Sequence, residues 1–172
     1  MTVLVRSATA NDVEVVGDIT VNAYSAGPGA GTTDYTAVLR DAQSRLEDAM
    51  LFVAVDQVTG TVVGSVTLAQ AHTTHSELAR PGELEVRYLS VDPNYWGQGV
   101  GSALMAQARS VAAEQQLVLV LDAITHNTKV HDMYTKMGFV RIPKRDFSPV
   151  EGVDLLAYID ATSPSYRPGA HD

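Results

Sequence analysis

The sequence predicts an α/β protein in which helices cover both faces of a β-sheet, and three observations support this class. Helical patterns follow the first, fourth and fifth predicted strands. Residues 117–122 form a nearly continuous apolar run, typical of a parallel strand that is covered on both faces. Hydrophobic residues make up 45% and charged residues 19% of the chain, which are ordinary values for a globular domain.

The length of 172 residues fits one domain that buries its own core. We expect this domain at residues 1–161. Residues 162–172 include Pro164, Pro168 and Gly169, so they are predicted to form a loose tail.

Hydrophobic periodicity justifies the elements of the first half of the chain. Val13, Val16 and Ile19 recur at helical spacing, and Gly60 after Val58 and Thr59 is typical of a hairpin turn. The glycine-rich stretch at 25–34 is predicted to be mobile. The expected elements are a strand at 3–6, helices at 9–24 and 36–49, and strands at 51–56 and 61–69.

The fourth predicted strand, at 84–91, changes phase in its middle. Its apolar residues are Leu84 and Val86 and then Leu89 and Val91, so either both faces are buried or a bulge inserts one residue. A bulge would leave backbone groups free for a ligand. The elements that follow are a helix at 100–115, a strand at 117–122, a helix at 127–137 ended by Gly138, and strands at 139–142 and 153–159.

Composition also excludes several classes of function. The formal net charge is −8, and the longest basic cluster, at 141–145, holds three charges, so nucleic-acid binding is not expected. An acidic surface favours a cationic partner such as an amine. The chain has no cysteine and its histidines lack the spacing of a zinc site, so we expect no metal. No signal peptide or membrane span is visible, and a cytoplasmic protein is expected.

The segment 89–104 joins a strand to a helix through three glycines at alternate positions. Pro93 ends the strand because it lacks an N–H group. The first turn of the helix that follows offers unpaired N–H groups and the positive end of the helix dipole. Glycines let phosphates approach that backbone, so the segment predicts an anion site; the alternative is a tight turn without a ligand.

Two common phosphate-binding motifs do not fit this segment. A mononucleotide P-loop needs a lysine, and none is present. In the dinucleotide fingerprint the third glycine would fall at Ser102 or Leu104, depending on the register. A nicotinamide-dependent oxidoreductase stays an alternative, because Asp122 lies about twenty residues on, where a ribose-binding acid is found.

The segment resembles motif A of the GNAT superfamily of acyl-CoA N-acyltransferases, in which a strand L-x-V-x-P runs into (Q/R)-x-x-G-x-(G/A). Trp96 departs from the usual Gln or Arg at the first position. Residues 127–139 are similar to the family's motif B, N-x-x-A-x-x-x-Y-x-x-x-G-F, with Val130 in the alanine position. Two motifs in the right order are far more specific than one.

The resemblance covers roughly residues 3–159 and implies a mixed sheet of about six to seven strands, whose fourth and fifth strands part in a V. It implies acetyl-CoA as the acyl-donor cosubstrate, although a longer acyl group is equally open. Asn127 would hydrogen-bond the cofactor or cap its own helix. The implied cofactor-binding residues are Leu89, Ser90, Val91, Trp96, Gly97, Gln98, Gly99, Val100, Gly101, Ser102, Asn127 and Tyr134.

Acyl transfer to a primary amine needs a base, because an ammonium group with a pKa of about 10.4 is charged at neutral pH. The resemblance assigns this role to Glu85, directly or through water, with Glu83 as the second choice; a carboxylate paired with Arg87 is the alternative. Tyr134 would protonate the departing thiolate, unless it is an ordinary core residue. The N–H group of Val91 would stabilise the oxyanion.

The acceptor pocket of the family is built from the segments that correspond here to 24–35 and 141–150. Tyr24, Tyr35 and Asp146 are therefore candidates for orienting the amine, although such residues are more often ordinary surface residues. The sequence does not identify the amine. Relatives are commonly homodimers. A non-catalytic acyl-CoA sensor on the same fold is the second alternative.

Overall fold

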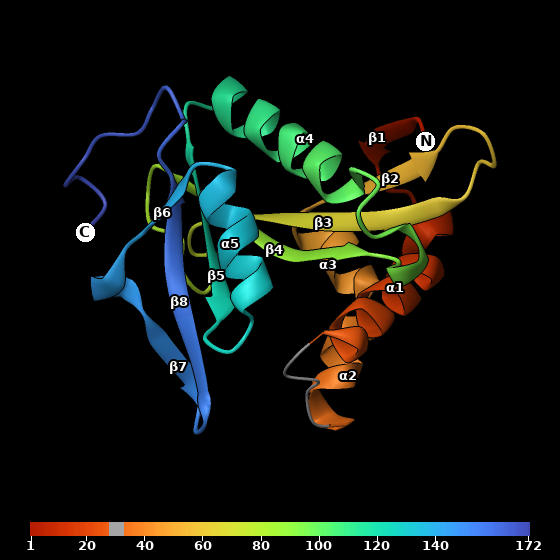
Figure 1. Cartoon of the computed structure of the whole chain (residues 1–172), viewed down its shortest axis with the longest axis horizontal. Helices are drawn as coiled ribbons and strands as arrows, with labels where there is room; N and C mark the ends of the chain where they lie inside the picture. Colours follow the sequence, from red (N-terminus) through yellow and green to blue (C-terminus); the bar gives the residue numbers. More distant parts are fainter. Residues whose placement is uncertain (28–32) are drawn as a thin grey trace.

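The structure, a computed structural model, describes residues 1–27 and 33–172, so most of the glycine-rich stretch predicted at 25–34 lies outside the described residues. The strands are β1 (Val3–Ser7), β2 (Met50–Asp56), β3 (Val62–Gln70), β4 (Glu83–Val91), β5 (Val118–Ile124), β6 (Phe139–Arg141), β7 (Phe147–Val150) and β8 (Val153–Asp160). They form one sheet in the order β1-β2-β3-β4-β5-β8-β6, and β7 also pairs with β8 (Figure 1). The predicted mixed sheet is confirmed, with one more strand than expected.

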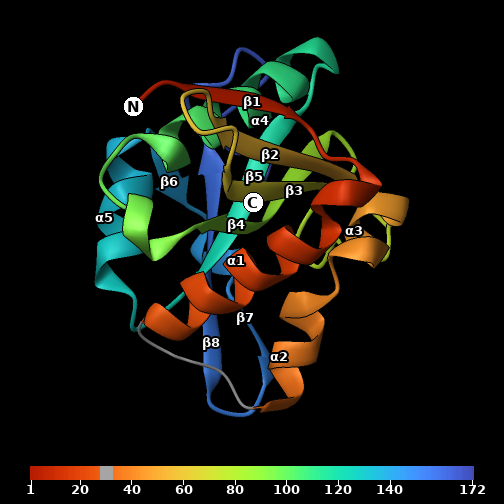
Figure 2. The same cartoon turned by 90° about the vertical axis from the view of Figure 1, so that its right-hand side faces the viewer.

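Helices cover both faces of this sheet. They are α1 (Val13–Ala26), α2 (Thr33–Arg40), α3 (Ala42–Asp48), α4 (Val100–Glu114) and α5 (Thr128–Lys136). Val16 of α1 and Ala42 of α3 pack on Val53 of β2, whereas Leu104 of α4 packs in the core of the other face. In Figure 2, α3 and α5 accordingly lie on opposite sides of the strands. Among the described residues, no helix combines the length and apolar character needed to cross a membrane.

The single helix predicted at 36–49 is wrong, because the structure has two helices separated at Asp41. The side chain of Asp41 accepts a hydrogen bond of 3.0 Å from the N–H group of Ser44 and caps α3. The break brings the carbonyl of Arg40 against α1 at Gly17. A Cβ atom placed on Gly17 would lie 2.6 Å from that carbonyl oxygen, so only glycine permits this approach.

Gly17→Ala is expected to destabilise the protein by about 1–2 kcal/mol. The clash is with a backbone atom, which cannot rotate away, and the better helix propensity of alanine, about 1 kcal/mol, offsets only part of it. Urea denaturation measures the change. Gly27→Ala is the matched control, because the nearest atom to a Cβ at Gly27 is 3.5 Å away. Equal stability of the two variants would contradict this account of the α1–α2 contact.

The phase change in the fourth strand is a bulge. β3 and β4 pair Ser65 with Ser90 and Thr67 with Arg87, so two residues of β4 lie opposite the one residue between Ser65 and Thr67. One of the two, Tyr88, adopts φ of +50°, which is rare for a residue with a side chain. The bulge was one of the two alternatives that the apolar pattern left open, and residues 83–86 are in addition buried on both faces.

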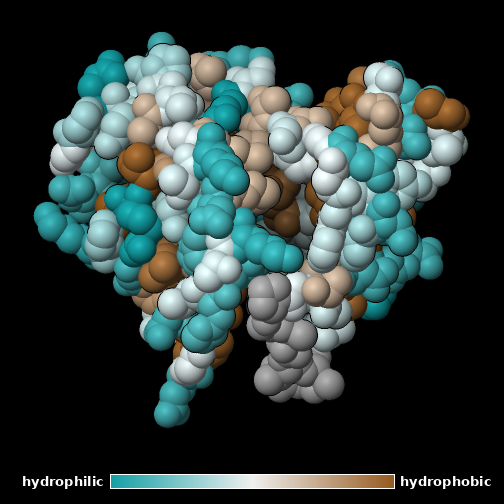
Figure 3. All heavy atoms as spheres, in the orientation of Figure 1, coloured by the Kyte–Doolittle hydropathy of each residue, from teal (hydrophilic) through white to brown (hydrophobic). Residues whose placement is uncertain are grey.

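The strands β4 and β5 part beyond their first three pairs. Glu83, Leu84 and Glu85 pair in parallel with residues 118–120, and no pair follows, although both strands continue. On its other edge, β5 pairs with β8 from Val120 onward. Figure 3 shows the surface hollowed between the α1–α2 side and the β5–β8 side, with apolar residues in its depth. The V that the resemblance implied is confirmed.

Two parts of the C-terminal region differ from expectation. β7 was missed because it is short, contains Pro149 and pairs only at the sheet edge. The segment predicted as a loose tail makes specific contacts: the ring of Tyr166 stacks on His171, and His171 Nδ1 lies 2.8 Å from Glu83 Oε1. Proline and glycine exclude regular structure there, but they do not prevent side-chain packing.

Candidate active site

The glycine loop presents a row of backbone donors. Gly97 and Gly99 adopt φ of +75° and +84°, and a Cβ atom on either would meet nothing within 4 Å. Gly99 caps α4, and no described residue accepts a hydrogen bond from the N–H groups of residues 97–102. These donors, together with the positive end of the α4 dipole, are suited to hold an anion such as a diphosphate.

At the end of β4, just before this loop, the backbone groups of Val91 face the gap between β4 and β5. Asp92 N–H donates to the Val63 carbonyl at 2.9 Å, and Val91 lies opposite Gly64. Because bonded and non-bonded pairs alternate in an antiparallel ladder, the N–H and C=O groups of Val91 point away from β3. The indole Nε1–H of Trp96 donates to that carbonyl at 2.8 Å. The Val91 N–H group stays available, as its predicted role requires.

The carboxylate of Glu85 is buried and holds several donors. Its Oε2 atom accepts hydrogen bonds of 2.8–3.0 Å from the Ser76 hydroxyl and from the N–H groups of residues 77–79. Its Oε1 atom lies 3.3 Å from Arg87, and the side chain is fully buried. Four donors to Oε2 and the nearby guanidinium of Arg87 hold this buried carboxylate in place, an arrangement that suits a structural role for Glu85 better than that of the direct base.

Glu83, the second choice for the base, is a structural ion pair. Arg145 donates two hydrogen bonds of 2.8 Å to its carboxylate, and His171 and the Arg80 N–H group add two more. Burial alone would raise the pKa of Glu83, but these donors outweigh it and lower the pKa. Glu83 lies where β4 and β5 are still paired, away from the gap.

Sequence reasoning overlooked Asp122 as a base. It lies on β5 two residues beyond the last pair with β4, and no described residue donates a hydrogen bond to its side chain. Burial raises its pKa to about 6; Arg87 opposes the shift, and the carboxylates of Glu85 and Glu77 add to it. The signal was a lone acid in the apolar run 117–124, a strand predicted to be covered on both faces.

Tyrosines line both sides of the gap. Tyr134 on α5 is 7% exposed, and its hydroxyl makes no hydrogen bond with a described residue. Burial raises the pKa of Tyr134, and the carboxylate of Asp122 raises it further. Tyr24 and Tyr35 lie with ring centres 6.4 Å apart, and burial raises the pKa of Tyr35 to about 12. The structure therefore brings Tyr24, Tyr35 and Tyr134 within electrostatic reach of Asp122.

Two other predicted residues have structural partners instead. The Asn127 side chain accepts a hydrogen bond from the Val130 N–H group at 3.3 Å and caps α5, which was one of its two predicted roles. Asp146 accepts a hydrogen bond of 2.8 Å from the Ala157 N–H group and forms an ion pair with Arg141. Neither side chain is among those gathered around Asp122.

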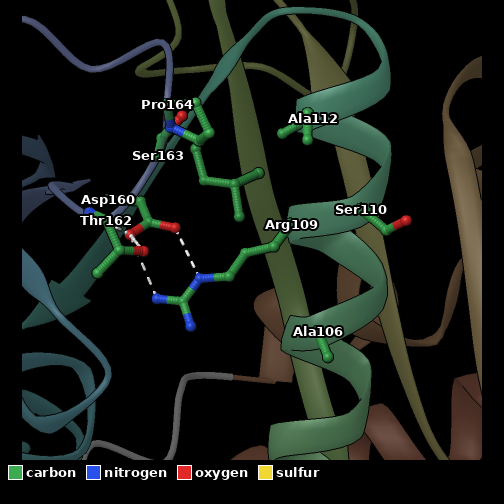
Figure 4. A pocket seen from close by; sticks show the side chains of 10 residues that line it. Ala106, Arg109, Ser110, Ala112, Asp160, Thr162, Ser163 and Pro164 are labelled. Atoms are coloured by element: carbon green, nitrogen blue, oxygen red, sulfur yellow. Dashed lines mark hydrogen bonds and ion pairs between the residues drawn. The ribbon is translucent and has the colours of Figure 1, made fainter.

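Two cavities lie outside the gap. One of about 280 Å³ separates α4 from the segment after β8, and Figure 4 shows Arg109 reaching across it to Asp160 at 2.7 Å. Another of about 350 Å³ lies between β7 and β8, beside Thr125. In the described ranges, no three His, Asp or Glu side chains converge as metal ligands. The geometry at the end of β4 therefore marks the candidate site.

The comparisons with known proteins agree with this geometry. A family described as the acetyltransferase (GNAT) family matches residues 18–139, which is more than half of the chain and includes both the glycine loop and Tyr134. A comparison with curated protein sequences finds no match. The nicotinamide oxidoreductase alternative loses its basis, because the glycine loop lies inside the family match.

Solved structures share the fold over nearly the whole chain. PaiA N-acetyltransferase from Thermoplasma acidophilum, in complex with coenzyme A, is 16% identical with a TM-score of 0.71, covering 92% of this chain and 98% of its own. A Corynebacterium glutamicum protein described as histone acetyltransferase HPA2 and related acetyltransferase is 20% identical, with a TM-score of 0.69 and coverage of 98% and 99%. YjaB from Escherichia coli is 23% identical, with a TM-score of 0.68 and coverage of 94% and 99%. With the family match and this fold together, the chain belongs to the acetyltransferase (GNAT) family.

Proposed function

We propose that the protein transfers an acetyl group from acetyl-CoA to a primary amine, by direct attack in a ternary complex without a covalent enzyme intermediate. One observation carries this proposal: the free N–H groups of residues 97–102 follow the stretch of β4 that has separated from β5. Membership of the family and the coenzyme A bound to a relative of the same fold support it.

The donor side uses backbone groups. The diphosphate of acetyl-CoA is held by the N–H groups of residues 97–102, and the pantetheine arm lies along Leu89, Ser90 and Val91, where β4 has lost its partner strand. The N–H group of Val91 faces the thioester oxygen. A fixed backbone donor stabilises the negative charge that develops there, because it needs no reorganisation during the reaction.

We assign the base to Asp122 in place of Glu85. Asp122 carries no hydrogen bond from a described residue, and its pKa of about 6 leaves it ionised at neutral pH yet more basic than an ordinary aspartate. It takes the proton that the ammonium group must lose before its nitrogen attacks the thioester carbonyl. Tyr24 and Tyr35 flank the amine, and Glu85 holds residues 76–79 in place.

Tyr134 supplies the proton for the leaving group. As the bond between carbon and sulfur breaks, the thiolate receives the phenolic proton, which the raised pKa of Tyr134 keeps in place until then. We expect Tyr134→Phe to lower kcat about 100-fold, the low end for general acids, with nearly unchanged affinity for CoA. Steady-state kinetics measures this. Tyr166→Phe, far from the gap, is the control, and equal kcat in the two variants would remove the role.

A CoA-release assay across a panel of primary amines tests the proposal. The panel includes small amines, amino acids, aminoglycosides and peptides, and each amine is run at several pH values with thiol detection. We expect thiol release that depends on one class of amine and rises as the pH passes about 6, where Asp122 ionises. Binding of acetyl-CoA without thiol release from any amine would overturn the proposal and favour an acyl-CoA sensor.

A further inference from the structure

Arg87 and Asp122 lie on opposite sides of the opening between β4 and β5. The last parallel pair joins Glu85 to Val120, and Arg87 and Asp122 each lie two residues further along their own strand. Because side chains alternate along a strand, Arg87 and Asp122 point to the same face of the sheet as that last pair. A cation and a carboxylate therefore border the gap on one face of the sheet.

This face is the one that α1 covers. Thr67 pairs with Arg87 on one side and with Leu51 on the other, so the three side chains share a face. Leu51 lies in a buried cluster with Val16 of α1. Since α1 also carries Tyr24, which flanks the amine in the proposed function, the two charged groups lie on the acceptor side of the site.

The guanidinium group of Arg87 is held weakly. Its Nη1 atom lies 3.3 Å from a carboxylate oxygen of Glu85 and 3.3 Å from one of Glu77. Its Nη2 atom donates a long hydrogen bond of 3.4 Å to the Tyr88 hydroxyl, and no described residue accepts a bond from its Nε atom. The side chain is 11% exposed, so part of this set of five N–H donors is available to a ligand.

The charges of Arg87 and Asp122 are not paired with each other. The ion pairs of Arg87 with described residues are those with Glu77 and Glu85, and neither involves Asp122. Burial raises the pKa of Asp122 and the charge of Arg87 opposes that rise, so the two groups lie within electrostatic reach. A ligand with an ammonium group for Asp122 and an anionic group for Arg87 fits this arrangement.

Glu77 occupies the place that such an anionic group would take. Its side chain is 46% exposed and belongs to the segment between β3 and β4, whereas that of Glu85 is fully buried. An exposed ion pair contributes little free energy, so a ligand carboxylate can displace the Glu77 side chain into solvent. The charge beside Arg87 is then unchanged, and its buried pair with Glu85 is kept.

We propose that the acceptor amine is an α-amino acid, an inference that rests on the proposed function. Its ammonium group binds Asp122, and its carboxylate binds Arg87 in place of Glu77. A guanidinium group binds a carboxylate through two parallel N–H donors, an interaction that an amine without an anionic group cannot make. Arg87 is therefore a specificity-determining residue for the acceptor.

Amino acids and the amines left after loss of their carboxylate, such as alanine and ethylamine, test this inference. The measured quantity is kcat/KM for the amino acid divided by kcat/KM for its amine, a ratio that does not depend on the folded fraction. The wild type should favour the amino acid. In Arg87→Lys, which keeps the charge beside Glu85 but loses the two parallel donors, the ratio should fall about tenfold. Arg6→Lys is the matched control, because Arg6 binds the Asp12 carboxylate in β1, at the far edge of the sheet.

Glu77→Gln should change the same ratio in the opposite direction. It removes the group that competes for Arg87, and we expect a rise of less than about fivefold, since an exposed ion pair is weak. A wild type that favours amines without a carboxylate, an unchanged ratio in Arg87→Lys, or a lower ratio in Glu77→Gln would overturn the inference. Absence of thiol release with every amine would instead count against the proposed function. Calorimetric binding of the same amino acids and amines to the CoA complex, in the wild type and Arg87→Lys, would then still decide on Arg87.

Discussion

Asp122→Asn is expected to lower kcat at least about 100-fold while leaving the affinity for CoA unchanged. General bases contribute about 10²–10⁴ to rate, and asparagine keeps the shape of the side chain but takes no proton. In the wild type, activity should rise as the pH passes about 6, because the carboxylate must be ionised to act. This rise near pH 6 is one limb of the pH–activity profile, and the residual activity of the variant should lack it.

The same substitution should stabilise the fold at neutral pH. Asp122 has a pKa raised from 3.8 to about 6, so the folded state disfavours its ionised form. The stability gained from the protonated side chain is present below pH 3.8 and is lost as the pH rises through about 6. Urea denaturation at pH 7.5 should therefore show a more stable variant. Activity near that of the wild type, with the limb near pH 6 intact, would contradict Asp122 as the base.

Glu85→Gln is expected to lower the free energy of unfolding by about 3 kcal/mol. The buried carboxylate accepts four hydrogen bonds from residues 76–79 and faces Arg87, and a neutral amide leaves that guanidinium without its buried partner. Urea denaturation measures the loss. Because we place Glu85 in a structural role, the limb of the pH–activity profile near pH 6 should persist in the folded variant.

Glu77→Gln is the matched control for this experiment. Glu77 also lies 3.3 Å from Arg87, but its side chain is 46% exposed. Removing an exposed partner should cost less than about 1 kcal/mol. If Glu85→Gln were as stable as Glu77→Gln and had lost the limb near pH 6, the base would be Glu85, as the resemblance implied.

Local patterns predicted those parts of the fold that depend on neighbouring residues. The change of phase between Val86 and Leu89 is a local signal, and the bulge at Tyr88 was one of the two alternatives that it offered. The break at Asp41 was missed because helical periodicity continues through it, while the contact that accommodates it joins Gly17 to Arg40. The separation of β4 from β5 followed from the family motifs and not from periodicity.

In the candidate site, too, local features could be predicted from the sequence and long-range contacts could not. The glycine loop was visible because its donors, its glycines and the helix that follows are contiguous in the chain. Glu85 and Asp122 could not be ranked, because the sequence does not reveal that residues 76–79 fold over Glu85 while no described residue donates to Asp122. Long-range contacts, which set the basicity of a carboxylate, are absent from local patterns.

The central claim is that the backbone after β4 holds the diphosphate of CoA while the separated strands admit the thioester arm. Titration of the ¹⁵N-labelled protein with CoA, followed by amide NMR, tests it most directly. The account predicts the largest shift changes at the amides of residues 97–102 and at Val91. Changes confined to other regions, such as the cavity beside Arg109, with the loop amides unmoved, would contradict it.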